Sequence, residues 1–120
     1  ARHYFRVDAA QLGTTPAALI ADVTAAVLAR PFRDSGIWHL TATGQASWHG
    51  FAKAIIDEAH ARGLIERKPA VVPIATADYP TPARRPAYSC LDTSQLAHDF
   101  AIDLPEWRQA LSQVMDSVGA

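Results

Sequence analysis

The sequence contains one cysteine, one methionine, no apolar run long enough to cross a bilayer and no excess of either charge. The single cysteine, Cys90, excludes a disulfide within the chain. A membrane helix is not expected, because it needs about 18 or more consecutive apolar residues. The 11 basic and 12 acidic side chains nearly cancel, which argues against nonspecific binding to nucleic acid or anionic lipid. We therefore expect neither nucleic acid nor membrane as a partner, and we expect any anion site to be local.

The large side chains available for a core are few. The chain has 120 residues and is 49% hydrophobic, but 24 of its residues are alanine. This composition is enough for one modest core, and we expect residues 1–120 to form a single domain. The sequence begins with Ala1 and without a signal-peptide hydrophobic region, so we expect a cytoplasmic protein and a piece of a longer chain.

Helical and extended patterns alternate along the chain, which favours an α/β fold with α+β character, about four helices and a few short strands. Strands are expected at residues 4–7, 37–40 and 70–74; Pro73 suits an edge strand. Helices are expected at residues 16–30, at 48–62 between a Ser47 cap and Gly63, after Asp92, and from Pro105 onward.

Aromatic residues at regular spacing predict the core. Trp48 opens a stripe of apolar residues on the second helix, and Trp107 opens another that continues through Ala110, Leu111, Val114 and Val118. We expect both tryptophans, and Trp38 on its strand, to be core anchors. Asp92 and Gln95 have the spacing of a capping box, so Asp92 is interpreted as a helix cap and not as a ligand group.

Motifs for common chemistries are missing. The five histidines have no metal-ligand spacing, and no serine lies in a Gly-x-Ser-x-Gly elbow. The glycines form neither Gly-x-Gly-x-x-Gly nor a phosphate-binding P-loop. No tyrosine is followed four residues later by lysine: Asp8, Ala83 and Asp92 stand there. We therefore expect no catalytic residue, no cofactor-binding residue and no metal ligand in this chain.

Two adjacent arginines in a proline-rich passage, residues 79–86, are the best candidates for specific chemistry. Guanidinium groups suit bidentate phosphate binding, and the flanking prolines reduce the entropy lost when the loop is held by a ligand. Arg84 and Arg85 therefore predict a phosphate site, with a solvated or ion-paired turn as the alternative.

The proline-rich passage also carries a resemblance to a known family. Tyr-Pro-Thr-Pro-Ala-Arg-Arg-Pro at residues 79–86, followed by Ser89, Leu91 and Asp92, resembles the C-terminal signature of the dTDP-4-dehydrorhamnose reductases, which are extended short-chain reductases. Other segments agree in order along nearly the whole chain: residues 11–13, 19–22, 36–40, 43–48, 100–102 and 104–108.

The resemblance implies a C-terminal substrate-binding portion whose NADPH-binding Rossmann domain, with the catalytic Thr/Tyr/Lys set, lies upstream of Ala1. Such an enzyme reduces the C4 ketone of dTDP-4-dehydro-L-rhamnose to dTDP-L-rhamnose. The implied partners are the dTDP-sugar, the chain's own Rossmann domain and a second copy in a homodimer. Arg85, and after it Arg84, would contact the diphosphate, while Gln11, Thr15 and Tyr79 would contact the base or sugar.

Some positions depart from the family pattern. Tyr88 and Cys90 stand where members usually have asparagine and arginine, and Ala18 and Ser117 stand where some members have magnesium-binding glutamates. We therefore expect no magnesium site. The changed loop residues keep a second hypothesis open: a non-catalytic interaction module, as in the reductase-like regulatory subunit of methionine adenosyltransferase.

Overall fold

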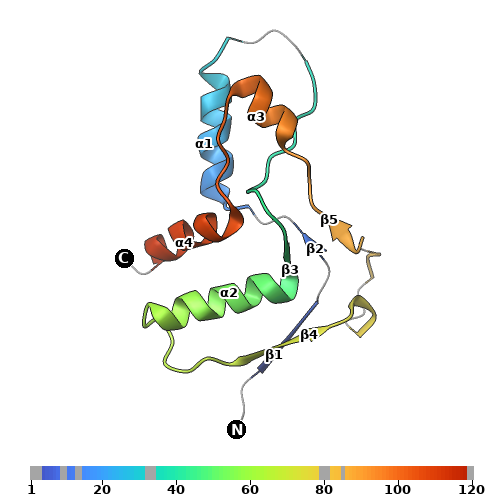
Figure 1. Ribbon diagram of the computed structural model, residues 1–120, viewed down its shortest axis with the longest axis vertical. Helices are drawn as coiled ribbons and strands as arrows, with labels where there is room; N and C mark the ends of the chain where they lie inside the picture. Colours follow the sequence, from blue (N-terminus) through green and yellow to red (C-terminus); the bar gives the residue numbers. More distant parts are fainter. Residues whose placement is uncertain are drawn as a thin grey trace.

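The computed structural model describes residues 4–8, 11–12, 15–31, 35–78, 82–84 and 86–118 (Figure 1). Within them lie four helices: α1 (Ala17–Leu28), α2 (Trp48–Ala61), α3 (Ser94–Phe100) and α4 (Trp107–Val118). The strands are short: β1 (Tyr4–Asp8), β2 (Gln11–Leu12), β3 (Ala46–Ser47), β4 (Ala70–Ile74) and β5 (Tyr88–Ser89). A 3₁₀ turn, η1 (Thr76–Asp78), follows β4. The expected four helices with a few short strands are confirmed.

The strands form two small sheets. β1 and β4 are parallel, with Tyr4 opposite Ala70 and Asp8 opposite Ile74. Pro73 therefore lies, as expected, on an edge strand, because β4 has a neighbouring strand on one side only. Proline is tolerated on such strands because it has no N–H to donate to a second neighbour. The second sheet has the order β3-β2-β5, with β2 antiparallel to β3 and parallel to β5. Helix α2 packs along the first sheet (Figure 1).

Two clusters of buried residues form the core. The first lies between α2 and α4 and consists of Ala42, Ala46, Ala59, Trp107, Ala110, Leu111 and Met115. The Phe51 ring meets the Trp107 ring edge-on at 6.2 Å between centroids, a favourable aromatic geometry. The expected role of Trp107 as a core anchor is confirmed, since only 5% of it is exposed.

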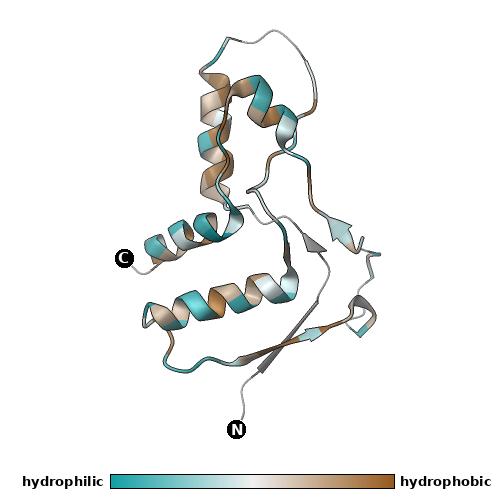
Figure 2. Cartoon of the chain, viewed as in Figure 1, coloured by the Kyte–Doolittle hydropathy of each residue, from teal (hydrophilic) through white to brown (hydrophobic). Residues whose placement is uncertain are grey.

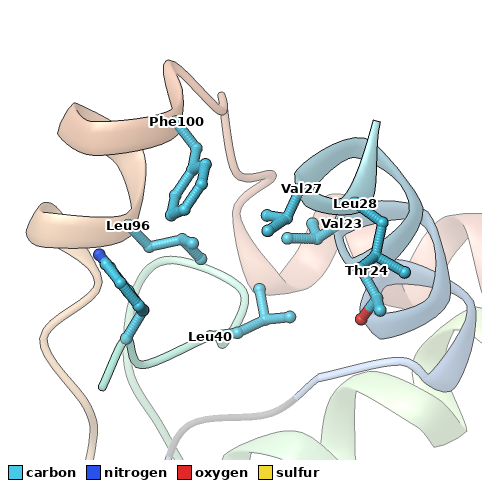
Figure 3. A pocket seen from close by; sticks show the side chains of 8 residues that line it. Val23, Thr24, Val27, Leu28, Leu40, Leu96 and Phe100 are labelled. Atoms are coloured by element: carbon cyan, nitrogen blue, oxygen red, sulfur yellow. The ribbon is translucent and has the colours of Figure 1, made fainter. Parts of the chain in front are cut away.

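The second cluster joins α1 to α3 through Val23, Leu96, Phe100 and Leu104. Beside it, an open cavity of about 220 Å³ is lined almost entirely by apolar side chains (Figure 3). Leu19 packs against both clusters, so α1 connects the two halves of the core.

The strand expected at residues 37–40 is wrong: this segment forms no ladder and runs as an extended connection. Its alternating pattern arises because Trp38 and Leu40 pack against the second cluster, whereas Ile37 is 81% exposed. The Trp38 ring meets Phe100 edge-on at 5.4 Å, and its indole N–H donates to Asp99 Oδ2 at 2.9 Å. The alternation of covered and exposed side chains at residues 37–40 is therefore real, but the Trp38 ring is covered by helix α3 and not by a neighbouring strand.

Two expectations about helical stripes are also wrong. Trp48 is 46% exposed because it occupies the first position of α2, and the buried side of that helix begins at Phe51. On α4, Val114 and Val118 are 37% and 63% exposed, and Met115 is buried in their place. The buried stripe of α4 follows the i, i+4 step from Leu111 to Met115.

A backbone crossing holds α4 in place. The Thr43 N–H donates to the Pro105 carbonyl at 2.8 Å, and the Trp107 N–H donates to the Thr43 carbonyl at 2.9 Å. Next to this bridge, Gly44 has φ +85°, and a Cβ built there would lie 3.0 Å from Cδ1 of Trp107. Glycine is required at this position both for its conformation and for its small size.

Arg62, at the end of α2, ties that helix to α4. Its guanidinium pairs with Glu58 and Asp116, and it donates to the carbonyl and hydroxyl oxygens of Ser112 at 3.2 and 3.0 Å.

The chain is extended in shape, with principal dimensions of 59 × 38 × 20 Å. Its Cα radius of gyration is 17.0 Å, whereas a compact domain of this length has about 14 Å. Most residues of helix α1 are apolar (Figure 2), yet its Ile20 and Leu28 are 47% and 74% exposed. Much apolar surface is therefore left uncovered by the chain itself.

Candidate functional site

The three-stranded sheet brings together two segments that the sequence places far apart. In its register the backbone of Gln11 lies between Ser47 on one side and Tyr88 on the other. Because β2 and β5 are parallel neighbours, the segment that contains Gln11 is joined directly to the end of the proline-rich passage. Of the expected site residues, Gln11 thus lies beside the strand into which the arginine loop leads.

Residues 79–87, here called the arginine loop, connect η1 to β5 (Figure 1). Arg84 lies in it four residues before Tyr88, and its side chain is exposed, which leaves its guanidinium accessible to a ligand. Arg85 and Tyr79 lie outside the described residues. Their predicted contacts with the ligand therefore stay predictions.

Thr15 lies apart from the loop, at the start of α1. It is half-buried and lines a cavity of about 170 Å³, whose other lining residues are all apolar: Pro16, Phe51, Trp107, Leu111 and Val114. The structure thus places Thr15 beside the first core cluster, and its predicted contact with a base or sugar stays a prediction.

Side-chain hydrogen bonds stabilise the starts of α2 and α3, the two helices that follow strands of this sheet. Ser47 caps α2 as expected, because its hydroxyl accepts the Gly50 N–H at 2.8 Å. Asp92 caps α3, since its Oδ1 accepts the Ser94 N–H at 2.9 Å, and this bond holds the pKa of the Asp92 carboxyl below its usual value. The expected capping box is not formed as predicted, because Thr93 holds the N-cap position and makes no side-chain cap bond; Asp92 still stabilises the start of α3 through Ser94.

Tyr88 is the residue of this site that sequence reasoning did not propose as a ligand contact. It is 55% exposed on β5 and lies two residues before Cys90. Partial burial and the neighbouring Cys90 raise the pKa of the Tyr88 phenol, so its ring is neutral at pH 7. A β-prone aromatic residue soon after Pro86 was the available signal for β5 and for this position.

The junction of β3 with α2 does not suit a dinucleotide cofactor. Dinucleotide sites need a strand, a glycine-rich turn and a helix, with backbone N–H groups free to meet the phosphates. At this junction the turn contains Ser47 and Trp48, and the Ser47 side chain already occupies the Gly50 N–H. This strand-to-helix junction therefore cannot cradle the phosphates of a nicotinamide dinucleotide.

Comparison with known proteins identifies the family. The family model described as RmlD substrate binding domain matches residues 1–119. The chain belongs to this family. A dTDP-4-dehydrorhamnose reductase from Burkholderia thailandensis is 43% identical over 122 residues, which cover 92% of this chain and 40% of that relative. The reductase of the same name from Aggregatibacter actinomycetemcomitans is 47% identical over 79 residues, or 66% of this chain and 27% of the relative.

Solved structures agree with this RmlD-type substrate-binding fold. A Clostridium acetobutylicum dTDP-4-dehydrorhamnose reductase matches with a TM-score of 0.82 and 26% identity, covering 99% of this chain and 40% of that one. The Bacillus anthracis enzyme, solved in complex with NADP, matches with a TM-score of 0.81 and 25% identity, covering 97% and 38%. The RmlD-type chain thus spans about two fifths of these reductases or less.

Two features are absent from the part of the chain that the structure describes. No helix in it combines the length and the apolar character needed to cross a membrane. In the same residues, no three histidine, cysteine or acidic side chains gather in a way that could hold a metal ion.

Proposed function

We propose that this chain is the nucleotide-sugar-binding portion of a dTDP-4-dehydrorhamnose reductase, which with NADPH reduces dTDP-4-dehydro-L-rhamnose to dTDP-L-rhamnose. The observation that carries the proposal is the family match over residues 1–119, together with relatives that bear this enzyme's name. The pairing of β2 with β5 supports it, because it joins the Gln11 segment to the arginine loop.

The chain's own residues would bind and orient the substrate. Arg85 and Arg84 would hold the diphosphate, since guanidinium groups pair with phosphate oxygens in bidentate geometry. Gln11, Thr15 and Tyr79 would contact the base or the sugar. NADPH supplies hydride in such an enzyme and would be held by residues outside this chain, as would the proton donor.

The uncovered apolar surface supports a further part of this proposal: an NADPH-binding Rossmann domain packs against the chain in the whole protein. The extended shape and the exposed Ile20 and Leu28 leave room for such a partner, and for a second copy in a homodimer. We place the whole protein in the cytoplasm, where a nucleotide sugar and NADPH are both available.

Titration of the chain with dTDP tests the proposal. Backbone amide signals should shift at residues 11–12 and 82–92, and the Arg85→Gln and Arg84→Gln variants should bind more weakly than the parent chain. Arg67→Gln is the matched control, because Arg67 is an exposed arginine on the connection between α2 and β4. Unchanged signals at these residues at millimolar dTDP, or equal weakening by all three variants, would contradict the proposed site.

A further inference from the structure

An exposed aromatic ring stands where the arginine loop enters the sheet. Tyr88 is 55% exposed although it lies on a strand that pairs with the central strand of its sheet. Tyrosine presents a large rigid face at a low entropy cost, and exposed aromatic rings are efficient stacking surfaces for nucleobases.

The Tyr88 residue is partly fixed by the fold. Its backbone lies in register with Gln11 through the parallel β2–β5 pairing, and the residue is partly buried. A ring that is already restrained loses less entropy when a ligand binds.

Charge and spacing also suit a nucleotide. Tyr88 lies four positions after Arg84, which limits their backbone separation to about 14 Å. In a nucleoside diphosphate one deoxyribose separates the diphosphate from the base, so a single ligand can reach both residues. The neutral Tyr88 phenol brings no negative charge near the phosphates.

We propose that Tyr88 is a further substrate-binding residue, whose ring stacks on the nucleobase of the bound dTDP-sugar while Arg84 holds the diphosphate. This inference rests on the proposed function. It adds an aromatic ring to the site, which neither Arg84 nor Gln11 carries. It also makes recognition depend on an aromatic base and not on the phosphates alone.

Variants at Tyr88 test the stacking. Calorimetric titration with dTDP compares the parent chain with Tyr88→Phe, which keeps the ring, and Tyr88→Leu, which keeps bulk but removes the aromatic face. Stacking predicts near-parent affinity for Tyr88→Phe and a loss of roughly 5- to 150-fold for Tyr88→Leu. Leu64→Ala is the control for an exposed apolar residue, since Leu64 is 42% exposed on the connection after α2. It should leave the affinity unchanged.

The outcomes separate the two proposals. If the parent chain does not bind dTDP, the proposed function fails and the stacking fails with it. If the parent chain binds but Tyr88→Leu binds equally well, or if Tyr88→Phe loses as much as Tyr88→Leu, only the stacking is overturned. A second measurement needs no variant: an intermolecular NOE between the Tyr88 ring protons and the thymine methyl group is expected in the saturated parent chain, and its absence would overturn the stacking.

Discussion

Substituting Gly44 and Gly63 by alanine separates two contributions to the free energy of unfolding: backbone strain at positive φ, and steric contact between the new Cβ and neighbouring side chains. Both glycines have positive φ, +85° and +73°. Gly63 ends α2 in a Schellman motif, with its N–H donating to the His60 carbonyl and the next N–H, of Leu64, donating to Ala59. A Cβ at Gly63 would meet nothing within 4 Å, whereas one at Gly44 would lie 3.0 Å from Trp107 Cδ1 and 3.1 Å from Glu106 Oε1.

The expected magnitudes follow from this difference. Alanine in the left-handed region costs about 1–2 kcal/mol at either position. The gain from a less flexible unfolded chain is shared by both variants and cancels in the comparison. At Gly44 the added methyl also presses on buried Trp107, and overpacking typically costs about 1–3 kcal/mol more. We therefore expect Gly63→Ala to lower the free energy of unfolding by about 1–2 kcal/mol and Gly44→Ala by about 2–5 kcal/mol.

Urea unfolding followed by tryptophan fluorescence and by circular dichroism measures both values in the same buffer. The slopes of free energy against urea should agree between the variants, so that the difference reflects stability and not a change in the unfolded state. Equal losses for Gly44→Ala and Gly63→Ala would refute the reasoning, because they would show that Trp107 yields to the new methyl group without cost.

Other variants probe the caps, the second cluster and the response to acid. Ser47→Ala should lower the free energy of unfolding by about 1 kcal/mol, because the Gly50 N–H loses its acceptor; a loss below about 0.3 kcal/mol would contradict the cap. Phe100→Ala should cost about 3–5 kcal/mol by urea unfolding and Phe100→Leu clearly less, since Phe100 is 5% exposed; equal costs would contradict this. The hydrogen bond from the Trp38 indole, and next the contact with His98, lower the pKa of Asp99. The stability from this carboxylate is therefore present above its ordinary pKa of 3.8 and is lost as the pH falls through the lower folded value. Asp99→Asn should therefore lose less stability than the parent chain on acidification. The free energy of unfolding, measured at several pH values from 5 to 2.5, tests this; an equal fall with pH in the variant and the parent chain would contradict it.

Sequence patterns predicted the long elements well. The 3.6-residue period and the caps located α2 between Ser47 and Gly63, and β-prone residues located β4. The strands of the second sheet could not be predicted, because each has only two residues and no period can be measured over two residues. The segment at 37–40 was misassigned for a related reason: alternation reports which side chains are covered, not whether a helix or a strand covers them.

The candidate site was only partly visible in the sequence. Arg84 stood out because its loop is rich in proline, and the resemblance pointed to Gln11. Their relation could not be predicted, because it depends on a parallel pairing of strands separated by more than 70 residues. The apolar surroundings of Thr15 were likewise hidden, since they come from α2 and α4.

The composition of the first core cluster limits the order in which the chain can fold during its synthesis on the ribosome. The buried residues that precede α4 in this cluster are all alanines, whereas every larger buried side chain in it comes from α4: Trp107, Leu111 and Met115. A nascent chain that ends before Trp107 can form α2 and pack it on the β1–β4 sheet, but it lacks the large buried side chains of the cluster between α2 and α4. The packing of α2 against α4 must therefore wait for α4 to leave the exit tunnel, whereas Val23, Leu96, Phe100 and Leu104 of the second cluster all precede α4 and can pack before it.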